Sequence, residues 1–391
     1  MALDPFATPI DRRGSASTKW NRYAGRDVLP FWVADMEFRA PEPVIAALHE
    51  RVDHGIFGYT DTPVGLTEAT LAFLDARYAW KVEPEWLVWL PGVVPGFNLA
   101  CRAVGERGDA VMTAVPVYYP FLDAPANAER RRIDTRLVLD GGRWAMDFEA
   151  LEAALTPDTR LFMLCNPQNP TGRIYERAEL ERLAEIAARH ELVLCSDEIH
   201  AELLLDETRL HLPIATLDAD TARRTITLMA PTKTFNTPGL SCAFAVIPDA
   251  TLRRRFRASG AGLVPGVGPL AYTAAEAAYR HGEPWRQALL QALRRNRDRL
   301  QGTVDALPGL SMTRVEATCL AWIDARGLGL EDPHGYFESQ GLGLSPGRQF
   351  GEDGFVPFNF ACHEAMLEEG LARLRRAVEG RVDAASHRRS G

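Results

Sequence analysis

The sequence predicts an α/β fold, in which a large domain with a mostly parallel seven-stranded sheet between helices is joined to a smaller α/β domain. Short apolar runs alternate with amphipathic stretches of helical periodicity along much of the chain. Strands that are apolar throughout are typical of a parallel sheet covered by helices on both faces. The length of 391 residues also exceeds the size at which one hydrophobic core stops growing, which favours a second, smaller domain.

The N-terminal part is expected to contain irregular chain and two helices before the sheet begins. Residues 1–44 are rich in Arg, Pro and aromatic side chains, and we assign them to the small domain. A helix is expected at Pro43–His54, which has proline near its start and glycine just beyond its end, and another at about Leu66–Tyr78. The large domain, 45–284, then contains seven apolar runs that predict strands: Trp86–Leu90, Ala110–Ala114, Ile133–Leu139, Leu161–Cys165, Leu192–Ser196, Thr225–Met229 and Ala243–Ile247.

Helical patterns separate several of these strands, and the clearest is Arg177–His190. After Pro284 the pattern changes. A long helix from Trp285 to about Leu307 precedes a strand and helix region, and we expect 285–380 to form the small C-terminal domain. Residues 381–391 are expected to be a disordered tail.

Composition excludes several classes of protein. Apolar residues make up 46% and charged residues 25%, as in an ordinary globular protein, and the net charge of −8 comes without a concentrated basic face. Nucleic acid is therefore not an expected partner. The six cysteines are scattered, with no C-x-x-C pair, which disfavours a disulfide framework or a metal site. No apolar run approaches about 18 residues, so we expect no membrane span and a cytoplasmic location.

Three polar residues follow apolar strands in an informative order: Asn169, Asp197 and Lys233. In open α/β sheets, ligands bind beyond the carboxyl ends of the strands, so these side chains are expected to converge. A pyridoxal phosphate enzyme needs such a set. The lysine forms a Schiff base with the cofactor aldehyde, the carboxylate keeps the pyridine nitrogen protonated, and the amide bonds the phenolic oxygen. Once the substrate displaces it, the lysine amine is a general base beside Cα.

Each of the three residues also has an ordinary structural interpretation. A lysine after a strand is usually a surface residue. An aspartate there is suited to cap the next helix, and Asn169 belongs to an Asn-Pro-Thr-Gly turn. Lys233, however, is followed by a rigid Asn-Thr-Pro-Gly turn that an exposed lysine does not need. The combination therefore favours the cofactor interpretation.

Two further segments fit a flat, phosphorylated cofactor. Tyr118 and Tyr119 follow the strand at Ala110–Ala114, and a tyrosine there belongs either to the core or to a stacking contact with the ring. Spacing does not choose between the two tyrosines. Pro91–Gly96 is a glycine-containing loop that opens a helical stretch, where backbone N–H groups and the helix dipole can hold phosphate. Its glycine spacing matches neither a Rossmann nor a Walker loop.

With these residues in place, the chain resembles a fold-type I pyridoxal phosphate enzyme of the class I and II aminotransferase superfamily. More narrowly, it resembles the MalY/PatB group of cystathionine β-lyases, which are carbon–sulfur (C–S) lyases. The likeness covers nearly the whole chain. It is carried by Phe31–Phe38, His54–Tyr59, Pro116–Tyr118, Cys165–Arg173, Ser196–His200, Thr232–Asn236 and Asn359–Cys362.

The resemblance implies roles for individual residues. Lys233, Asp197 and Tyr118 would be catalytic, with Lys233 as the Schiff-base lysine and Tyr118 stacked on the ring. It also implies a homodimer in which each subunit contributes one tyrosine to its partner's site. The implied cofactor contacts are Val93, Val94, Tyr118, Asn169, Asp197, His200, Thr232 and Lys233, together with Tyr59 from the other subunit.

The substrate end departs from the family pattern. An arginine normally stands two residues before the Asn of the C-terminal Asn-Phe motif, where it binds the substrate carboxylate as a bidentate fork. This chain has Pro357 there, and proline has no hydrogen bond to donate. Either another arginine replaces it, with Arg348 the nearest candidate, or the substrate is not an ordinary α-amino acid. Asp35 and Asn359 are also expected to bind the substrate.

The resulting expectation is a pyridoxal phosphate-dependent C–S β-lyase that acts on cystathionine or related S-substituted cysteines. The products of this α,β-elimination are a thiol, pyruvate and ammonia. A class I or II aminotransferase is an alternative, because both reactions use the same residues and differ in whether a keto acid acceptor is required. A third alternative is a regulatory or binding protein with little catalysis, since fold alone does not determine function.

Overall fold

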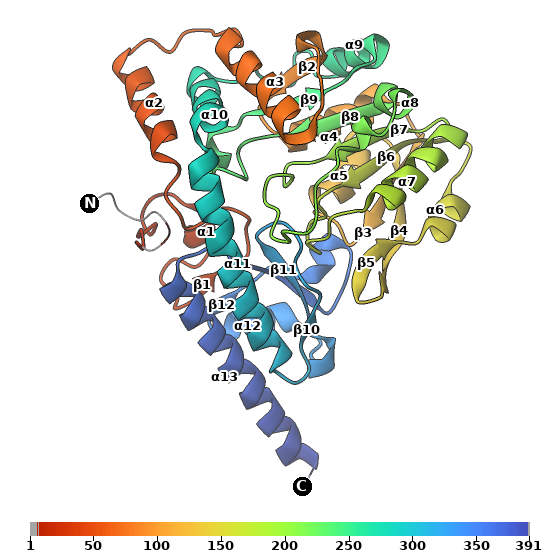
Figure 1. The fold of residues 1–391 in the computed structure, drawn as a ribbon. Coiled ribbons are helices and arrows are strands. Elements are labelled where there is room, and N and C mark those ends of the chain that lie inside the picture. Colours follow the sequence, from red (N-terminus) through yellow and green to blue (C-terminus); the bar gives the residue numbers. More distant parts are fainter. Residues whose placement is uncertain (1–5, 7, 390–391) are drawn as a thin grey trace.

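The computed structural model describes residue 6 and residues 8–389, which form a large sheet-containing part and a smaller α/β part (Figure 1). The long helix α11 (Glu283–Asp305) runs from the large part into the small one. The expected α/β fold is therefore confirmed.

The large part is built on an eight-stranded sheet with the strand order β2-β9-β8-β7-β6-β3-β4-β5. Only β9 and β5 run opposite to the other strands. All seven expected strands are present. The eighth, β5, was missed because it has only four residues, of which three are consecutive apolar residues, and follows β4 across a tight Gly141-Gly142 turn. The strands are β2 (Leu87–Leu90), β3 (Ala110–Val115), β4 (Arg131–Asp140), β5 (Arg143–Met146), β6 (Thr159–Cys165), β7 (Val193–Asp197), β8 (Thr225–Met229) and β9 (Ala243–Val246).

Helices cover both faces of this sheet, and side chains alternate between two cores. Within β6, Leu161 packs in a cluster with Phe97 of α4, whereas Phe162 packs in a second cluster with Leu180 of α7. Such alternation is what a strand buried on both faces requires. The helices are α2 (Glu42–Asp53), α3 (Val64–Tyr78), α4 (Val93–Ala103), α5 (Pro120–Asn127), α6 (Phe148–Ala154), α7 (Arg177–Arg189), α8 (Ala219–Arg223), α9 (Ala250–Ser259) and α10 (Pro269–His281).

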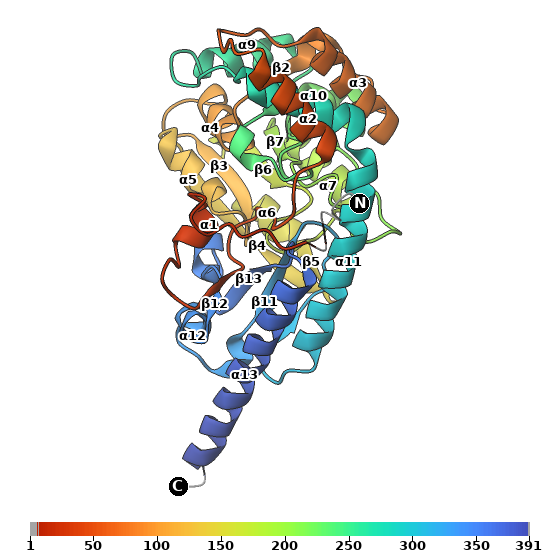
Figure 2. The same cartoon turned by 90° about the vertical axis from the view of Figure 1, so that its left-hand side faces the viewer.

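The small part combines C-terminal elements with the N-terminal segment. Its three-stranded antiparallel sheet has the order β10-β11-β13, and β1 (Leu29–Pro30) pairs with β12 (Leu342–Gly343) in a separate two-stranded sheet. Figure 2 shows α1 (Thr18–Asn21) on the side of the molecule where β12 and β13 lie. The remaining elements are β10 (Ser311–Met312), β11 (Leu320–Asp324), α12 (Pro333–Ser339), β13 (Phe355–Asn359) and α13 (Glu364–Arg389).

The last helix continues past residue 381, where we expected a tail to begin, and runs to Arg389. The remainder of that expected tail, 390–391, lies outside the described residues, and the domain boundaries stay a prediction. No helix in the described part of the chain is long and apolar enough to cross a membrane.

The register of the central strands brings their carboxyl ends to one level. Cys165, the last residue of β6, is the pairing partner of Asp197, the last residue of β7, and Asp197 is in turn paired with Leu228 of β8. Residues that leave these three strands therefore emerge side by side at one edge of the sheet.

Candidate active site

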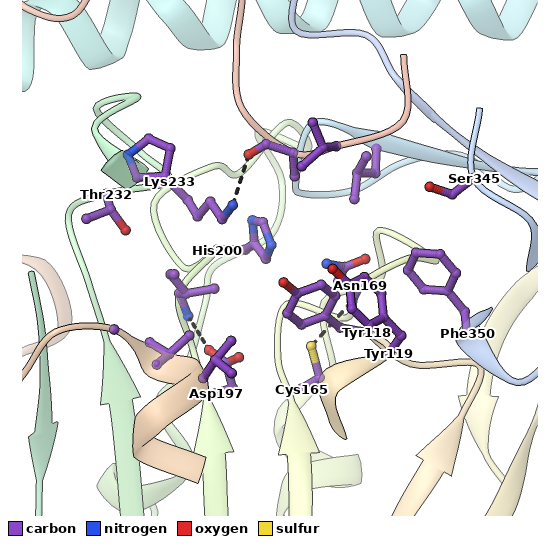
Figure 3. A pocket seen from close by; sticks show the side chains of 18 of the residues that line it. Tyr118, Tyr119, Cys165, Asn169, Asp197, His200, Thr232, Lys233, Ser345 and Phe350 are labelled. Atoms are coloured by element: carbon purple, nitrogen blue, oxygen red, sulfur yellow. Dashed lines mark hydrogen bonds between the residues drawn. The ribbon is translucent and has the colours of Figure 1, made fainter. Parts of the chain in front are cut away.

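A cavity of about 700 Å³ lies at this edge, and the expected cofactor residues of one chain meet in it. Figure 3 shows Tyr118, Asn169, His200 and Lys233 around the open space, with Asp197 at its base. The expected residues that line the cavity are Val93, Val94, Tyr118, Asn169, Asp197, His200, Thr232 and Lys233.

Lys233 reaches into the cavity from the loop that follows β8. Its Nζ donates a hydrogen bond of 3.0 Å to the backbone carbonyl of Ala34, which belongs to the N-terminal segment (Figure 3). Burial lowers the pKa of this amine, although Asp35 and Asp197 oppose the shift. A carbonyl therefore orients the amine while its surroundings favour the neutral, nucleophilic form.

Asp197 is a buried carboxylate at the end of β7. Its Oδ1 accepts a hydrogen bond of 3.1 Å from the Ile199 N–H. Burial raises its pKa to about 7, although that N–H and the Lys233 charge both pull the pKa down. A cationic group placed against this carboxylate would restore its full ionisation, because opposite charges stabilise each other strongly away from water.

Asn169 and His200 each present an unused polar atom at the site. Asn169 Oδ1 and His200 Nδ1 are buried and have no hydrogen-bond partner among the described residues. The Asn169 loop is held by paired backbone bonds of 2.8 Å between Gln168 and residues 172 and 173. Burial lowers the pKa of His200 to about 3, so the ring is neutral at physiological pH. Because both residues line the cavity, these two atoms are available to bond a group that enters it.

Both tyrosines that follow β3 line the cavity, but in different surroundings. Tyr118 is the more buried, while Tyr119 is 44% exposed, and their ring centroids are 4.9 Å apart. Burial raises the pKa of Tyr118, so its phenol stays protonated. The structure thus places the Tyr118 ring deeper in the cavity, and its stacking role stays a prediction.

The N-terminus of α4 forms the end of the cavity suited to phosphate. Val93 and Val94 are its first two residues, and N–H groups of the first helical turn have no partners within the helix. Glycine at position 96 lets the helix approach β8 closely, since a Cβ there would lie 2.8 Å from Leu228 Cδ2. This packing brings the helix start beside Thr232, which lines the same cavity.

These groups fit pyridoxal phosphate. The cavity offers a lysine amine for the aldehyde, a buried carboxylate for the ring nitrogen, two unpartnered polar atoms for the phenolic oxygen and a helix start for the phosphate.

Tyr59, expected to contact the cofactor of the partner subunit, lies away from the cavity of its own chain. It lies in the chain between α2 and α3, is fully exposed, and does not line the cavity of its own chain.

Asp35 and Asn359, expected to bind the substrate, are occupied by other contacts and do not line the cavity. Asp35 Oδ2 lies 2.5 Å from an Arg12 guanidinium nitrogen, and the Asn359 amide donates to the carbonyls of Val33 and Asp35 at 2.6 and 2.8 Å. Both side chains therefore hold the N-terminal segment in place over the cavity.

Arg348, the expected replacement for the missing arginine, is also outside the cavity wall. It is exposed in the short helical turn Gly347–Phe350, whose next two residues, Gln349 and Phe350, do line the cavity. Among the described residues, the arginine that lines the cavity is instead Arg22. The sequence offered no signal for it, because it lies in an irregular segment far along the chain from the motifs.

Comparisons with known proteins place this fold and site in a family. Residues 26–374 match the family model of class I and II aminotransferases, and the chain belongs to that family. It is 38% identical to cystathionine β-lyase PatB of Bacillus subtilis over 383 residues, which cover 94% of this chain and 98% of that protein.

Solved structures agree with this assignment. The structure of OvoB superposes with a TM-score of 0.94 at 49% identity, covering 95% of this chain and 98% of that one. Cystalysin from Treponema denticola, whose structure contains a pyridoxal 5′-phosphate cofactor, superposes with a TM-score of 0.92 at 30% identity, covering 97% of this chain and 100% of that one. The expected resemblance to this superfamily, and to its MalY/PatB group, is confirmed.

Proposed function

We propose that the chain is a pyridoxal phosphate-dependent C–S β-lyase that acts on cystathionine or related S-substituted cysteines. The observation that carries the proposal is the convergence of Lys233, Asp197 and Asn169 in one cavity. The likeness to PatB, which is named a cystathionine β-lyase, supports this reaction over others that use the same residues. The overall reaction takes an S-substituted cysteine and water to a thiol, pyruvate and ammonia.

Different residues of the cavity would hold different groups of the cofactor. Lys233 would bind the aldehyde, Asp197 the ring nitrogen, and Asn169 with His200 the phenolic oxygen. The N–H groups of Val93 and Val94, with Thr232, would bind the phosphate. When bound, pyridoxal phosphate supplies an electron-accepting ring that stabilises negative charge at the substrate Cα.

Lys233 is the residue to which we assign the transfer of the Cα proton. Burial lowers the pKa of this amine, which favours its free, basic form, and the free amine can remove the proton from the substrate Cα. The Ala34 carbonyl, 3.0 Å from Nζ, orients the amine. An anionic Asp197 would keep the ring nitrogen of the bound cofactor protonated, and that positive charge would stabilise the negative charge that develops at the substrate Cα. A thiolate then leaves from Cβ and takes up a proton.

We also propose that two chains form the complete site as a homodimer, with Tyr59 reaching the partner's cofactor phosphate. Four exposed apolar side chains within nine residues of the chain support this: Ile56, Phe57, Tyr59 and Val64 are all more than half exposed. Such surfaces mark interaction sites. Mixing Lys233→Ala and Tyr59→Ala chains tests the arrangement, because a hybrid dimer has one intact site. Activity above that of either variant alone supports it, and a mixture no better than its components rejects it.

The test of the reaction is an assay of purified holoenzyme with cystathionine and S-ethylcysteine in the absence of any keto acid. We expect pyruvate and ammonia in equal amounts with a free thiol. An aminotransferase, the alternative that the family model keeps open, would require a keto acid acceptor and release no thiol. No turnover of either kind, despite bound cofactor, would favour a binding protein.

A further inference from the structure

A lyase of this kind must bind a carboxylate, and this inference rests on the proposed function to that extent. The position where the family carries its arginine is Pro357, a buried residue of β13 that is paired with Trp322 of β11. Proline offers no hydrogen-bond donor. A carboxylate in a partly enclosed cavity needs a cationic partner, since an unpaired charge removed from water is costly. Another residue must supply that charge.

Within the described part of the chain, the cavity wall offers two basic side chains besides the neutral His200. One is Lys233, whose amine is committed to the cofactor and to proton transfer. The other is Arg22, which follows α1 in the N-terminal segment. No hydrogen bond or ion pair joins the Arg22 guanidinium to another described residue. Two other arginines of the same segment are ion-paired: Arg12 binds Asp35 and Glu37, and Arg26 binds Glu338.

Arg22 is nevertheless held in position. Its guanidinium carbon lies 4.7 Å from the ring centroid of Trp32 and 5.6 Å from that of Tyr23. Trp32, also part of the cavity wall, is anchored by a 3.1 Å bond from its indole N–H to the Lys19 carbonyl and by a 3.2 Å bond from the Ser345 hydroxyl to its own carbonyl. Stacking uses the face of a guanidinium and leaves its N–H edge available for an anion.

We propose that Arg22 is the residue that binds the substrate carboxylate in this protein. It replaces in function the arginine that Pro357 displaces, from a different segment of the chain. Asp123 lines the same cavity but is not ion-paired with Arg22, so the cation is not neutralised from within the cavity.

Two different carboxylates are candidates for this contact. Every S-substituted cysteine carries one on Cα, and the departing thiol of cystathionine carries a second. Three amines separate them with purified Arg22→Ala holoenzyme: S-ethylcysteine has only the first carboxylate, cystathionine has both, and S-ethylcysteamine has neither. If Arg22 binds the first, KM rises about 10- to 100-fold for both amino acids, as expected for lost charge-assisted hydrogen bonds, with kcat less affected. If only cystathionine is affected, Arg22 binds the second carboxylate and does not replace the arginine that Pro357 displaces.

Matched variants complete the kinetic test. Arg22→Lys should recover part of the loss, because it keeps the charge but not the bidentate fork. Arg26→Ala, from the same segment but paired with Glu338, should leave KM unchanged, and Arg348→Ala tests the rival arginine. An equal loss on all three amines, including S-ethylcysteamine, or no loss on any of them, overturns the proposal. So does a KM increase confined to Arg348→Ala.

A binding measurement separates this inference from the proposed reaction. The probe is 3-(ethylthio)propanoate, which has the carboxylate but no amine and cannot react. Calorimetry should show binding to the holoenzyme that weakens about 10-fold or more in Arg22→Ala. If the enzyme performs no elimination but this probe binds through Arg22, only the proposed function fails. If elimination occurs and neither probe nor substrate depends on Arg22, only this inference fails.

Discussion

Two walls of one cavity differ in how they are built. The first wall comes from the ends of adjacent strands and carries Asn169, Asp197 and Lys233. The second is assembled from the N-terminal segment and the small part, where the Asn359 amide bonds the Val33 carbonyl across 326 positions of the chain. The residues proposed to hold the cofactor lie on the first wall, and the arginine proposed to bind the substrate carboxylate lies on the second. The roles that the family pattern implies can therefore be assigned from the sequence more reliably for residues of the first wall than for residues of the second.

The largest expected effect tests the first wall. In Lys233→Ala, elimination should fall by at least about 10³-fold, because a positioned base that also anchors the cofactor is lost. Steady-state pyruvate release measures this. Borohydride reduction followed by peptide mapping should label Lys233 in the wild-type holoenzyme and no lysine in the variant. A label at another lysine would contradict the assignment.

The next effect concerns Asp197. Asp197→Asn should lower kcat by about 10²- to 10³-fold, the cost of removing a positioned charge, with little change in KM. The absorbance spectrum of the bound cofactor should change as well, since the ring nitrogen loses its ionic partner. A variant with wild-type kcat would remove Asp197 from the mechanism.

The pH dependence of apoprotein stability checks the same residue. The folded-state pKa of Asp197 is raised from 3.8 to about 7, so the folded chain holds this proton more tightly than the unfolded chain does. Its contribution to stability is therefore present at low pH and is lost as pH rises from about 4 through 7. In urea melts, the free energy of unfolding of Asp197→Asn should therefore increase relative to that of the wild type as pH rises through this interval. A difference that does not change with pH would contradict the shift.

A smaller effect, on stability, is expected from the second wall. Lys19 is 1% exposed and lies 2.9 Å from Glu37 Oε1 and 3.5 Å from Asp35 Oδ1. Replacing it with Met leaves carboxylates short of a partner and should lower the free energy of unfolding by about 3–5 kcal/mol. Chemical denaturation measures this. The exposed Arg13→Ala is the control and should change little. A Lys19→Met protein as stable as the control would show that this cluster does not hold the segment.

The smallest effect distinguishes positioning from substrate binding at Asn359. Its amide donates to two backbone carbonyls, so Asn359→Ala should cost about 1–3 kcal/mol of stability through unsatisfied buried groups. Because the bonded segment includes Ala34, which orients Lys233, kcat should fall more than KM rises. A large KM increase without loss of stability would restore the expected direct contact with substrate.

Much of the first wall could be predicted from the sequence because each of its residues closely follows a recognisable apolar run. The seven strands were found by the same signal. The eighth, Arg143–Met146, escaped it because the strand lies at the sheet edge and its apolar run is only three residues long. Arg22 escaped for a different reason. A cation at the end of a four-residue helix has no periodicity to reveal which surface it faces.

The sequence by itself determined the α/β class, the family and the order of the lysine, carboxylate and amide, because strand polarity and turn chemistry are local properties of the chain. Only the tertiary structure decided which distant segments close the cavity. It assigned Asp35 and Asn359 to the support of residues 33–36 and placed Arg22 on Trp32 at the cavity wall. Such contacts depend on how separate elements pack together, and the spacing of residues along the chain carries no record of them.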